Sequence, residues 1–389
     1  MADDDFMAWP TETTSDPARI IERLILVSGH DEVSGPSQSI KLRALASSVR
    51  LRWIYLCDTK VRRFMNDWQP KGRFRSWIWR VGVCASTMAY AGLIPGVAKY
   101  AIDRAAVAGL RRRFGPETAD CLPVFFIGAI GYRRKMVVAW MDRQGNCAAV
   151  GKLPLGRLAA QALGDEAMAI SGPASKLGIA MPALIRWDET TGFQLQSALP
   201  GRMCYEPFGE RHTALLVKMV SPAPLAVETV YSGLLNSKDR RVAEQAKFLL
   251  AEHTGESVRP AIVHGDFTQS NLKNIAGNEL AILDWEYYSP RGVALADAAY
   301  FQLFLGYFVR RLTGPALLDY VLRFVDNELF ARLCEVATIG VSQRHCFACL
   351  GLLTIAQSRI DDGLGETDEI VSVILNIVDG MKQRGLFGN

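Results

Sequence analysis

Short apolar runs separated by polar turns occupy the middle of the chain. Runs of this length are typical of strands, and the polar stretch 142–146 has the composition of a turn between two of them. The pattern predicts an antiparallel meander followed by a helix over 157–171, although Gly164 interrupts that helical composition. The strands predicted in this region are 123–127, 136–141, 147–152 and 193–199.

Longer segments with helical patterning dominate the second half of the chain. Two short apolar runs, 260–263 and 280–283, interrupt them and have the length of buried strands. A small sheet region ahead of a larger helical region predicts an α+β fold. The helices predicted in this half are 211–219, 240–253, 296–311, 315–337 and 370–383.

The first 119 residues differ from the rest in charge and in pattern. Between Lys41 and Arg113, sixteen Lys or Arg residues stand against three Asp, a local balance of +13 in a chain of net charge +4. The stretch 37–63 has a helical pattern, and 73–80 is basic and aromatic. We therefore expect a mostly helical N-terminal extension with an anionic partner, such as a membrane surface, a phosphorylated ligand or nucleic acid.

The uncharged stretch 81–98 allows three interpretations. Its eighteen residues reach the lower limit of a transmembrane helix, but they are rich in small residues and broken by Pro95-Gly96. The preceding Trp77 and Trp79, flanked by arginines, favour an interfacial helix at the inner face of a membrane. The third interpretation is an ordinary helical domain packed on the rest of the chain. Because no known nucleic-acid motif accompanies the basic residues, nucleic acid is the least favoured partner.

Composition permits a large core in a reducing compartment. Hydrophobic residues make up 49% of the 389 residues, and the eight cysteines show no framework spacing. The acidic start, 1–5, is the reverse of a secretory signal, so we expect a cytoplasmic protein with free thiols. Cys346 and Cys349 form a Cys-x-x-Cys without the second pair that a zinc site requires, and we expect them in a buried helix.

Asp266, Asn271 and Asp284 form the most specific pattern in the chain. Asn271 follows Asp266 by five residues, and Asp284 follows Asn271 by thirteen. The apolar runs on either side and the turn composition of 276–279 predict a loop and a hairpin that bring the three together. Phosphoryl transfer from a nucleotide requires such a set. One carboxylate accepts the proton of the attacking hydroxyl, while an amide oxygen and a second carboxylate hold Mg²⁺.

The string His-Gly-Asp-(four residues)-Asn at 264–271, followed by Ile-Leu-Asp-Trp-Glu at 282–286, resembles the aminoglycoside phosphotransferase and choline kinase family, relatives of the protein kinases. The resemblance implies a bilobal protein-kinase-like fold that uses ATP and Mg²⁺. It implies that Asp266 is the catalytic base and that Asn271 and Asp284 are the magnesium ligands. His264 would be the histidine that braces the loop.

A further segment, 292–297, resembles the Gly-Asp-Pro-x-x-Asp segment of that family, with Val293 and Ala294 in place of Asp-Pro. The resemblance implies that Asp297 supports the catalytic loop from behind.

The nucleotide side of the site is expected in the meander. Lys152 ends its third strand and is the candidate cation for the α and β phosphates, and Glu166, in the next helix, is its candidate ion-pair partner. The first turn, with Gly128 and Gly131, is expected to cover the phosphates with backbone amides. The family's segment between the lobes matches 196–199. The resemblance implies that backbone groups there, near Gln196 and Ala198, bind adenine.

These features predict three regions: an N-terminal extension (1–119), a sheet lobe (120–200) and a helical lobe with the catalytic loop (201–389). The predicted activity is ATP- and magnesium-dependent phosphorylation of a hydroxyl on a sugar, aminosugar or saccharide-lipid precursor. An acidic cluster over 361–369 suits either a cationic acceptor or a solvated loop. The alternative is a nucleotide-binding pseudokinase or scaffold at a membrane surface.

Overall fold

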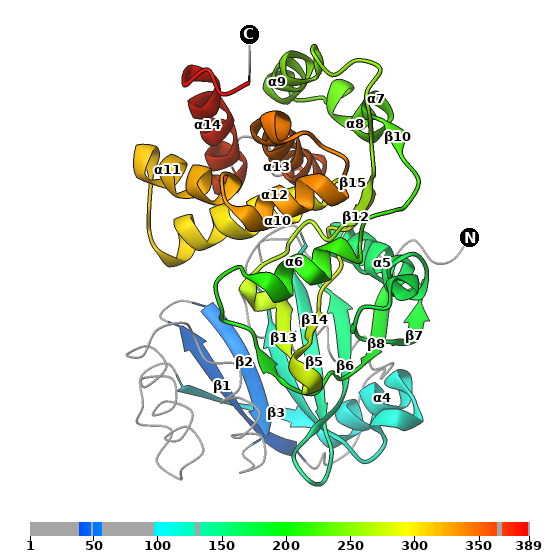
Figure 1. The fold of residues 1–389 in the computed structure, drawn as a ribbon. Helices are drawn as coiled ribbons and strands as arrows, with labels where there is room; N and C mark the ends of the chain where they lie inside the picture. Colours follow the sequence, from blue (N-terminus) through cyan, green and yellow to red (C-terminus); the bar gives the residue numbers. More distant parts are fainter. Residues whose placement is uncertain (1–38, 48–49, 57–96, 129–132, 364–367, 388–389) are drawn as a thin grey trace, which may run out of the picture. The chain divides into compact units, whose positions relative to one another are not determined.

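The computed structural model describes residues 39–47, 50–56, 97–128, 133–363 and 368–387, and side chains from Val107 onward. The chain divides into two compact units (Figure 1). One, the sheet unit, comprises 1–167 and 182–198, and the other, the helical unit, comprises 168–181 and 199–389. The basic aromatic stretch and nearly all of the uncharged stretch 81–98 lie outside the described residues, so their three interpretations stay predictions.

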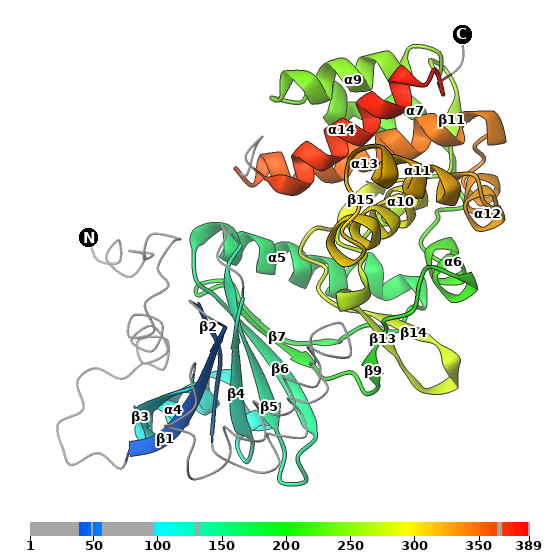
Figure 2. The ribbon, with the colours of Figure 1, turned by 90° about the vertical axis from the view of Figure 1, so that its left-hand side faces the viewer.

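In the described part of the sheet unit, eight strands form an antiparallel sheet in the order β3-β1-β2-β4-β5-β6-β8-β7. Figure 2 shows β2, β4, β5 and β6 side by side within it. The meander predicted from the apolar runs is confirmed as β4, β5 and β6. The strands are β1 (Ser39–Ser47), β2 (Arg50–Leu56), β3 (Val97–Asp103), β4 (Leu122–Ile127), β5 (Lys135–Met141), β6 (Cys147–Pro154), β7 (Leu184–Asp188) and β8 (Phe193–Ser197).

The prediction of helix over 37–63 is wrong where the structure describes that stretch. β1 pairs with β2 and β3, and β2 pairs with β4, so these strands extend the predicted meander on one side. The sequence carries a short strand signal, because polar and apolar residues alternate along 41–44 and 51–53. Where the structure describes it, the extension predicted to be mostly helical contributes three strands to the sheet, together with α4 (Arg104–Phe114).

Along the chain, α4 precedes β4 and α5 (Arg157–Ser171) follows β6. The bounds of α5 are those predicted from the sequence. Phe114, the last residue of α4, contacts Trp140 and Phe193 edge-on, with ring centroids 5.3 and 5.1 Å apart. A Cβ on Gly151 would lie 2.3 Å from Cε1 of Phe114. Gly151 thus allows Phe114 to pack directly on β6, beside Lys152.

The helical unit is built around α10 and α13, which pack closely (Figure 1). A Cβ on Gly351 of α13 would lie 2.7 Å from the Cα of Ala296, which explains how closely the two helices approach. The main helices are α6 (Glu210–Val217), α9 (Arg240–Leu250), α10 (Ala294–Phe304), α11 (Gly314–Val325), α12 (Glu328–Val336), α13 (Arg344–Asp361) and α14 (Glu369–Gln383). Two single turns, α7 (Val227–Val230) and α8 (Ser232–Leu235), precede α9.

Two predicted helices differ in detail. The single helix expected over 315–337 is two, because Asn327 begins a new one by accepting a hydrogen bond at Oδ1 from the N–H of Phe330 (2.9 Å). The helix expected over 296–311 ends in a π-helical turn, Leu305–Val309. Cys346 and Cys349 are buried in α13, as predicted, and burial raises the pKa of the Cys346 thiol to about 12.

Three small sheets complete the helical unit. The predicted hairpin is confirmed as β13 (Leu272–Asn274) and β14 (Leu280–Ile282), which β9 (Arg202–Met203) joins. β12 (Ala261–Val263) pairs with β15 (Ser289–Gly292), and β10 (Leu225–Ala226) pairs with β11 (Ser257–Val258).

No single helix among the described residues is long and apolar enough to cross a membrane, and one bent pair, 328–336 with 341–361, passes that test by length and composition.

Candidate active site

The loop between β12 and β13 carries the residues of the catalytic motif. It turns sharply at Gly265, whose φ of +78° favours glycine. A Cβ at this position would lie 2.2 Å from the carbonyl oxygen of Tyr287, so the close approach of 287 also requires glycine. The loop ends in a 3₁₀ turn, Gln269–Asn271, that leads directly into β13.

His264 is fully buried and joins separate parts of the site. Its Nδ1 accepts a hydrogen bond from the N–H of Asp266 (3.2 Å), and its Nε2 lies 2.9 Å from the carbonyl oxygen of Leu283. This pattern suits the neutral ring with the proton on Nε2. The ring also packs edge-on against Trp285 (centroids 4.9 Å). His264 therefore ties the loop to the segment after β14, the position that a bracing histidine requires.

Asp297, in the first turn of α10, lies behind the same loop. Its Oδ2 accepts from the N–H of His264 (2.7 Å) and its Oδ1 from the N–H of Gly265 (2.9 Å). Because it is completely buried, desolvation raises the pKa of its carboxyl to about 7, against the effect of the two donors. Both carboxylate oxygens are used to hold the backbone, so Asp297 can position the loop but cannot reach a substrate.

Asp266 projects from the loop with its side chain 24% exposed. Nδ2 of Asn271 donates to Oδ2 of Asp266 (2.8 Å) and to its carbonyl oxygen (2.9 Å). The amide of Asn271 thus sets the carboxylate's orientation. Because Nδ2 faces Asp266, Oδ1 of Asn271 is directed away from it and is the atom able to act as a metal ligand.

Asp284 lies just beyond β14 and has a φ of +64°, which is uncommon for a residue other than glycine. The N–H of its neighbour Leu283 donates to the carbonyl oxygen of Asn271 (2.8 Å), which brings the two candidate ligands to adjacent strand ends. One carboxylate and one amide oxygen are the donor set that Mg²⁺ accepts when it keeps waters and phosphate oxygens as its other ligands. The residues present therefore fit magnesium. Among the described residues, no three His, Cys, Asp or Glu side chains cluster as a metal site.

A buried arginine that the sequence analysis missed lies beside the candidate base. Nη2 of Arg359, on α13, is 3.8 Å from Oδ1 of Asp266 and donates to the hydroxyl oxygen of Tyr300 (2.8 Å). Its guanidinium also lies over the rings of Tyr287 and Tyr300, 5.0 and 5.7 Å from their centroids. A single arginine at the end of an apolar helix gives no local signal of this placement.

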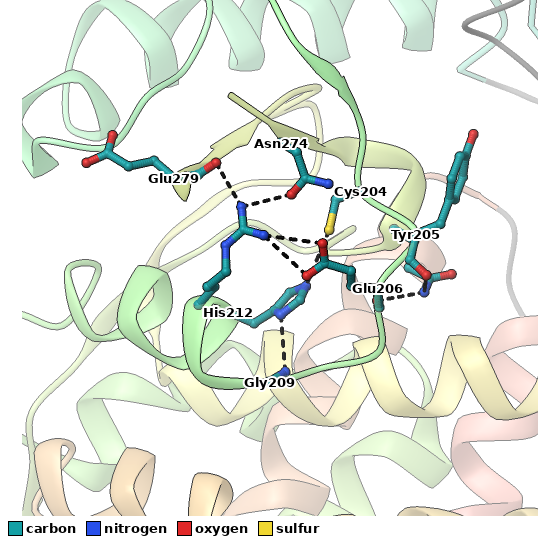
Figure 3. A network of polar contacts seen from close by, with 9 residues as sticks. Cys204, Tyr205, Glu206, Gly209, His212, Asn274 and Glu279 are labelled. Carbon is teal, nitrogen blue, oxygen red and sulfur yellow. Dashed lines mark hydrogen bonds and ion pairs between the residues drawn. The ribbon is translucent and has the colours of Figure 1, made fainter. Parts of the chain in front are cut away.

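A polar network attaches the catalytic loop to the segment 204–209 (Figure 3). Nε2 of Gln269 donates to the carbonyl oxygens of Tyr205 (2.9 Å) and Glu206 (2.8 Å). Arg211 extends the network, because its guanidinium donates to Glu206 (3.2 Å), to Oδ1 of Asn274 (2.8 Å) and to the carbonyl oxygen of Glu279 (3.1 Å). Loop, hairpin and α6 are thereby held as one piece.

His212 lies under this network and is neutral. Burial, together with the positive charge of Arg211, lowers the pKa of His212 to about 4. Its Nδ1 accepts from the N–H of Gly209 (3.2 Å; Figure 3), and its ring stacks on Phe208 (centroids 5.2 Å). These contacts assign it to packing at the start of α6.

The sheet unit contains a buried chain of polar side chains that begins at Lys152. Nζ of Lys152 lies 2.5 and 2.7 Å from the two carboxylate oxygens of Glu166. Glu166 also accepts from Nε2 of Gln194 (2.6 Å), and Gln194 accepts from Nε2 of Gln196 (2.9 Å). All four are buried, and β6 and β8 bring them together by pairing Lys152 with Gln194. The sequence analysis missed Gln194, although Gln at alternate positions of a strand that also carries Phe193 and Leu195 is a usable signal.

Two of the remaining predicted nucleotide contacts, Gly128 and Ala198, directly follow strands. Gly128 follows β4, and its N–H donates to the carbonyl oxygen of Lys135 (2.9 Å), which closes the β4–β5 turn. Gly131 lies outside the described residues. Gln196 lies in β8 with its side chain committed to the buried chain, and Ala198 follows that strand.

The acidic cluster is largely used within the fold. Asp361 accepts from Nε2 of Gln357 (2.7 Å), Asp368 caps α14 by accepting from two backbone N–H groups, and Glu369 accepts from the hydroxyl of Tyr307. This favours a structural role over a site for a cationic acceptor.

No family model and no curated protein sequence matches this chain. Solved structures similar to it include macrolide 2′-phosphotransferase MphH from Brachybacterium faecium, at 15% identity, with 70% of this chain and 97% of that chain covered and a TM-score of 0.40. Aminoglycoside phosphotransferase APH(4)-Ia is similar at 12% identity, 67% and 93% coverage and a TM-score of 0.43. Choline kinase LicA from Streptococcus pneumoniae is similar at 12% identity, 66% and 92% coverage and a TM-score of 0.38. The solved structures to which this chain is similar thus include aminoglycoside phosphotransferases and a choline kinase, the family that its motifs resemble.

Proposed function

We propose that this protein is an ATP- and magnesium-dependent kinase that phosphorylates a hydroxyl of a small molecule, with Asp266 as the catalytic base. The arrangement of Asp266 carries the proposal. Asn271 holds its Oδ2, and His264 and Asp297 hold the backbone on either side of Gly265. Oδ1 is then the oxygen assigned to the acceptor hydroxyl.

The reaction needs positioning more than covalent chemistry from the protein. The acceptor oxygen attacks the γ-phosphorus while Asp266 takes the hydroxyl proton, and the bond from the γ-phosphorus to the oxygen that bridges it to the β-phosphate breaks to leave ADP. Magnesium, when bound, would neutralise charge on the phosphates, and Asn271 Oδ1 with the Asp284 carboxylate would hold it. Lys152, fixed by Glu166, supplies a cation of constant position for the donor phosphates.

Supporting the loop by buried groups explains how a partly exposed carboxylate can keep one orientation. The two backbone hydrogen bonds to Asp297 and the ring of His264 remove the loop's freedom before substrate binds, so less ordering is needed in the transition state. The loop and its motif place no restriction on the acceptor beyond a hydroxyl. The acceptor class proposed from the sequence is a sugar, an aminosugar or a saccharide-lipid precursor.

The proposal is tested by nucleotide binding and turnover together. Isothermal titration with ATP is run with and without Mg²⁺ on the wild type, on Asp284→Asn and, as a control, on Asp319→Asn, whose carboxylate pairs with Arg384 on the surface (2.7 Å). We expect magnesium to strengthen ATP binding in the wild type and the control but not in Asp284→Asn. ADP release is then screened across sugars, aminosugars and lipid-linked saccharides. Equal magnesium dependence in wild type and Asp284→Asn would contradict the proposal.

A further inference from the structure

Arg359 is a fixed positive charge beside the candidate base. An arginine stays protonated in a protein, so its charge does not disappear when it is buried. Its side chain is 12% exposed, and it is held in place by the Tyr300 hydroxyl and by the rings of Tyr287 and Tyr300. Such a guanidinium is already oriented before any ligand arrives.

The contacts of Arg359 do not use all its donors. Nη2 donates to Tyr300 and faces Asp266 at 3.8 Å, which is beyond hydrogen-bond distance. Nε is buried and has no hydrogen-bond partner among the described residues. Leaving a buried donor unpaired is unfavourable, and Nη2, the nitrogen that faces Asp266, is the donor that an oxygen of a bound acceptor would meet. Asn271 is hydrogen-bonded to the carboxylate of Asp266, whereas Arg359, at 3.8 Å, is not.

The acidic residues near Arg359 do not form a cation-binding site beside it. Asp368 of the acidic cluster interacts with Arg359 electrostatically, but its Oδ1 caps α14. Asp361 and Glu369 are hydrogen-bonded to Gln357 and Tyr307. The guanidinium of Arg359, with Nη2 3.8 Å from Oδ1 of Asp266, would therefore lie close to a hydroxyl held by that oxygen. An ammonium group next to that hydroxyl would be repelled, and an anionic group would be attracted.

A row of aromatic rings continues from Tyr300 along α10 into its π-helical turn. Phe304 lies 6.2 Å from Tyr300 between ring centroids, and Phe308 lies 4.8 Å from Phe304. Phe304 and Phe308 are half-buried, so part of each ring faces outward. Aromatic faces of this kind suit the C–H faces of a sugar ring.

We propose that the acceptor is a sugar acid, a saccharide with a carboxylate or phosphate close to the reacting hydroxyl, and that Arg359 determines this specificity by binding the anionic group. The proposal rests on the proposed kinase function and narrows its acceptor class. The hydroxyl proton passes to Asp266, the phosphoryl group passes from ATP to the hydroxyl oxygen, and ADP leaves. The anionic group of the acceptor takes no part in bond changes.

The test compares matched acceptors on the full-length protein. Glucuronate, glucose 6-phosphate, glucose and glucosamine share a ring and differ in charge. ADP release is measured for wild type, Arg359→Gln, Arg359→Lys and the control Arg384→Gln, whose arginine pairs with Asp319 on the surface (2.7 Å). Glucuronate and glucose 6-phosphate distinguish a carboxylate from a phosphate as the group recognised.

We expect wild type and Arg384→Gln to show kcat/KM at least about tenfold higher for one of the two acids than for glucose, and lowest for glucosamine. Arg359→Gln should bring all four within about threefold, and Arg359→Lys should keep the order at lower kcat/KM. Circular dichroism shows that each variant is folded. A wild-type preference for glucose or glucosamine, or an acid preference that survives in Arg359→Gln, would overturn the proposal.

Binding decides the case in which none of the four acceptors is phosphorylated. Saturation-transfer NMR with glucuronate and glucose 6-phosphate, on protein loaded with Mg²⁺ and ADP, should show one of them bound to the wild type and not to Arg359→Gln. Absence of binding by both overturns the acceptor assignment. Selective binding without any turnover instead counts against the kinase function, as does an equal magnesium dependence of ATP binding in wild type and Asp284→Asn.

Discussion

The Lys152 chain of the sheet unit and the Asp266 loop of the helical unit use buried polar groups in different ways. In the first, Lys152, Glu166, Gln194 and Gln196 satisfy one another, and all are buried. In the second, the buried groups are His264 and Asp297, and they serve to hold an aspartate that is itself 24% exposed. Lys152, a cation that must keep one position, is enclosed by its polar partners. Asp266, a candidate base that must contact a substrate, is held through its loop and keeps its carboxylate partly exposed.

This difference predicts different consequences of mutation. Substitution within the Lys152 chain should first affect stability, because a charge is left unpaired in the interior. Substitution of Asp266 should first affect catalysis, because its loss leaves the supporting groups intact.

The largest expected effect on stability is that of Glu166→Gln, which leaves the buried ammonium of Lys152 without its carboxylate. We expect a loss of about 3–5 kcal/mol in the free energy of unfolding, measured by urea denaturation. The matched control is Asp120→Asn, which removes an exposed ion pair with Arg143 (3.1 Å, 79% exposed) and should cost about 0–1 kcal/mol. The double variant Lys152→Met/Glu166→Gln should regain most of the loss. A Glu166→Gln protein as stable as Asp120→Asn would show that the pair is not buried as described.

The next effect is a pH dependence caused by Asp297. Its folded-state pKa of about 7 lies above the ordinary value of 3.8, so the folded protein binds this proton more tightly than the unfolded chain does. Asp297 therefore contributes a loss of stability as pH rises from about 4 to about 7, and no further change above that. The full swing is on the order of 4 kcal/mol.

This is measured by urea denaturation of wild type and Asp297→Asn across that pH range. The difference in unfolding free energy between the two proteins should change with pH in that window. The wild type should become less stable relative to the variant as pH rises. A difference that stays constant from about pH 4 to about pH 8 would show that the carboxyl of Asp297 has no raised pKa.

The smallest effect expected is that of Gln269→Ala, which removes the two hydrogen bonds to the carbonyl oxygens of Tyr205 and Glu206. We expect a loss of about 1–3 kcal/mol in unfolding free energy, because two hydrogen bonds that hold the loop are lost. Amide hydrogen exchange in 266–271 should also become faster. Unchanged exchange there would mean that the segment 204–209 does not restrain the loop.

Much of the fold could be predicted from local pattern. The meander and the helix Arg157–Ser171 follow from runs whose period and length match their elements. β1 and β2 are harder to recognise because helical residues such as Leu, Ala and Arg obscure their alternation, and the pairing that decides the matter is with β4, far along the chain. The break before α12 depends on the capping by Asn327, a signal that the sequence contains.

Some residues of the candidate site could be predicted from the sequence, and others could not. Asp266, Asn271 and Asp284 could be predicted because their spacing is short and tied to a loop and a hairpin. Arg359 could not, because it reaches Asp266 only through the packing of α13 on α10, and nothing near it in the sequence reports that contact. The predicted phosphate contact of Gly131 lies outside the described residues, and the roles of all these residues stay predictions.

The central claim, that Asp266 is the base, is tested most directly by the kinetics of Asp266→Asn with an acceptor found in the screen. Asparagine keeps the shape and cannot take the proton, so kcat should fall by about 10²–10⁴ while the Kd for ATP with Mg²⁺ and the unfolding free energy stay close to wild type. A variant that binds ATP normally and retains wild-type kcat would contradict the assignment.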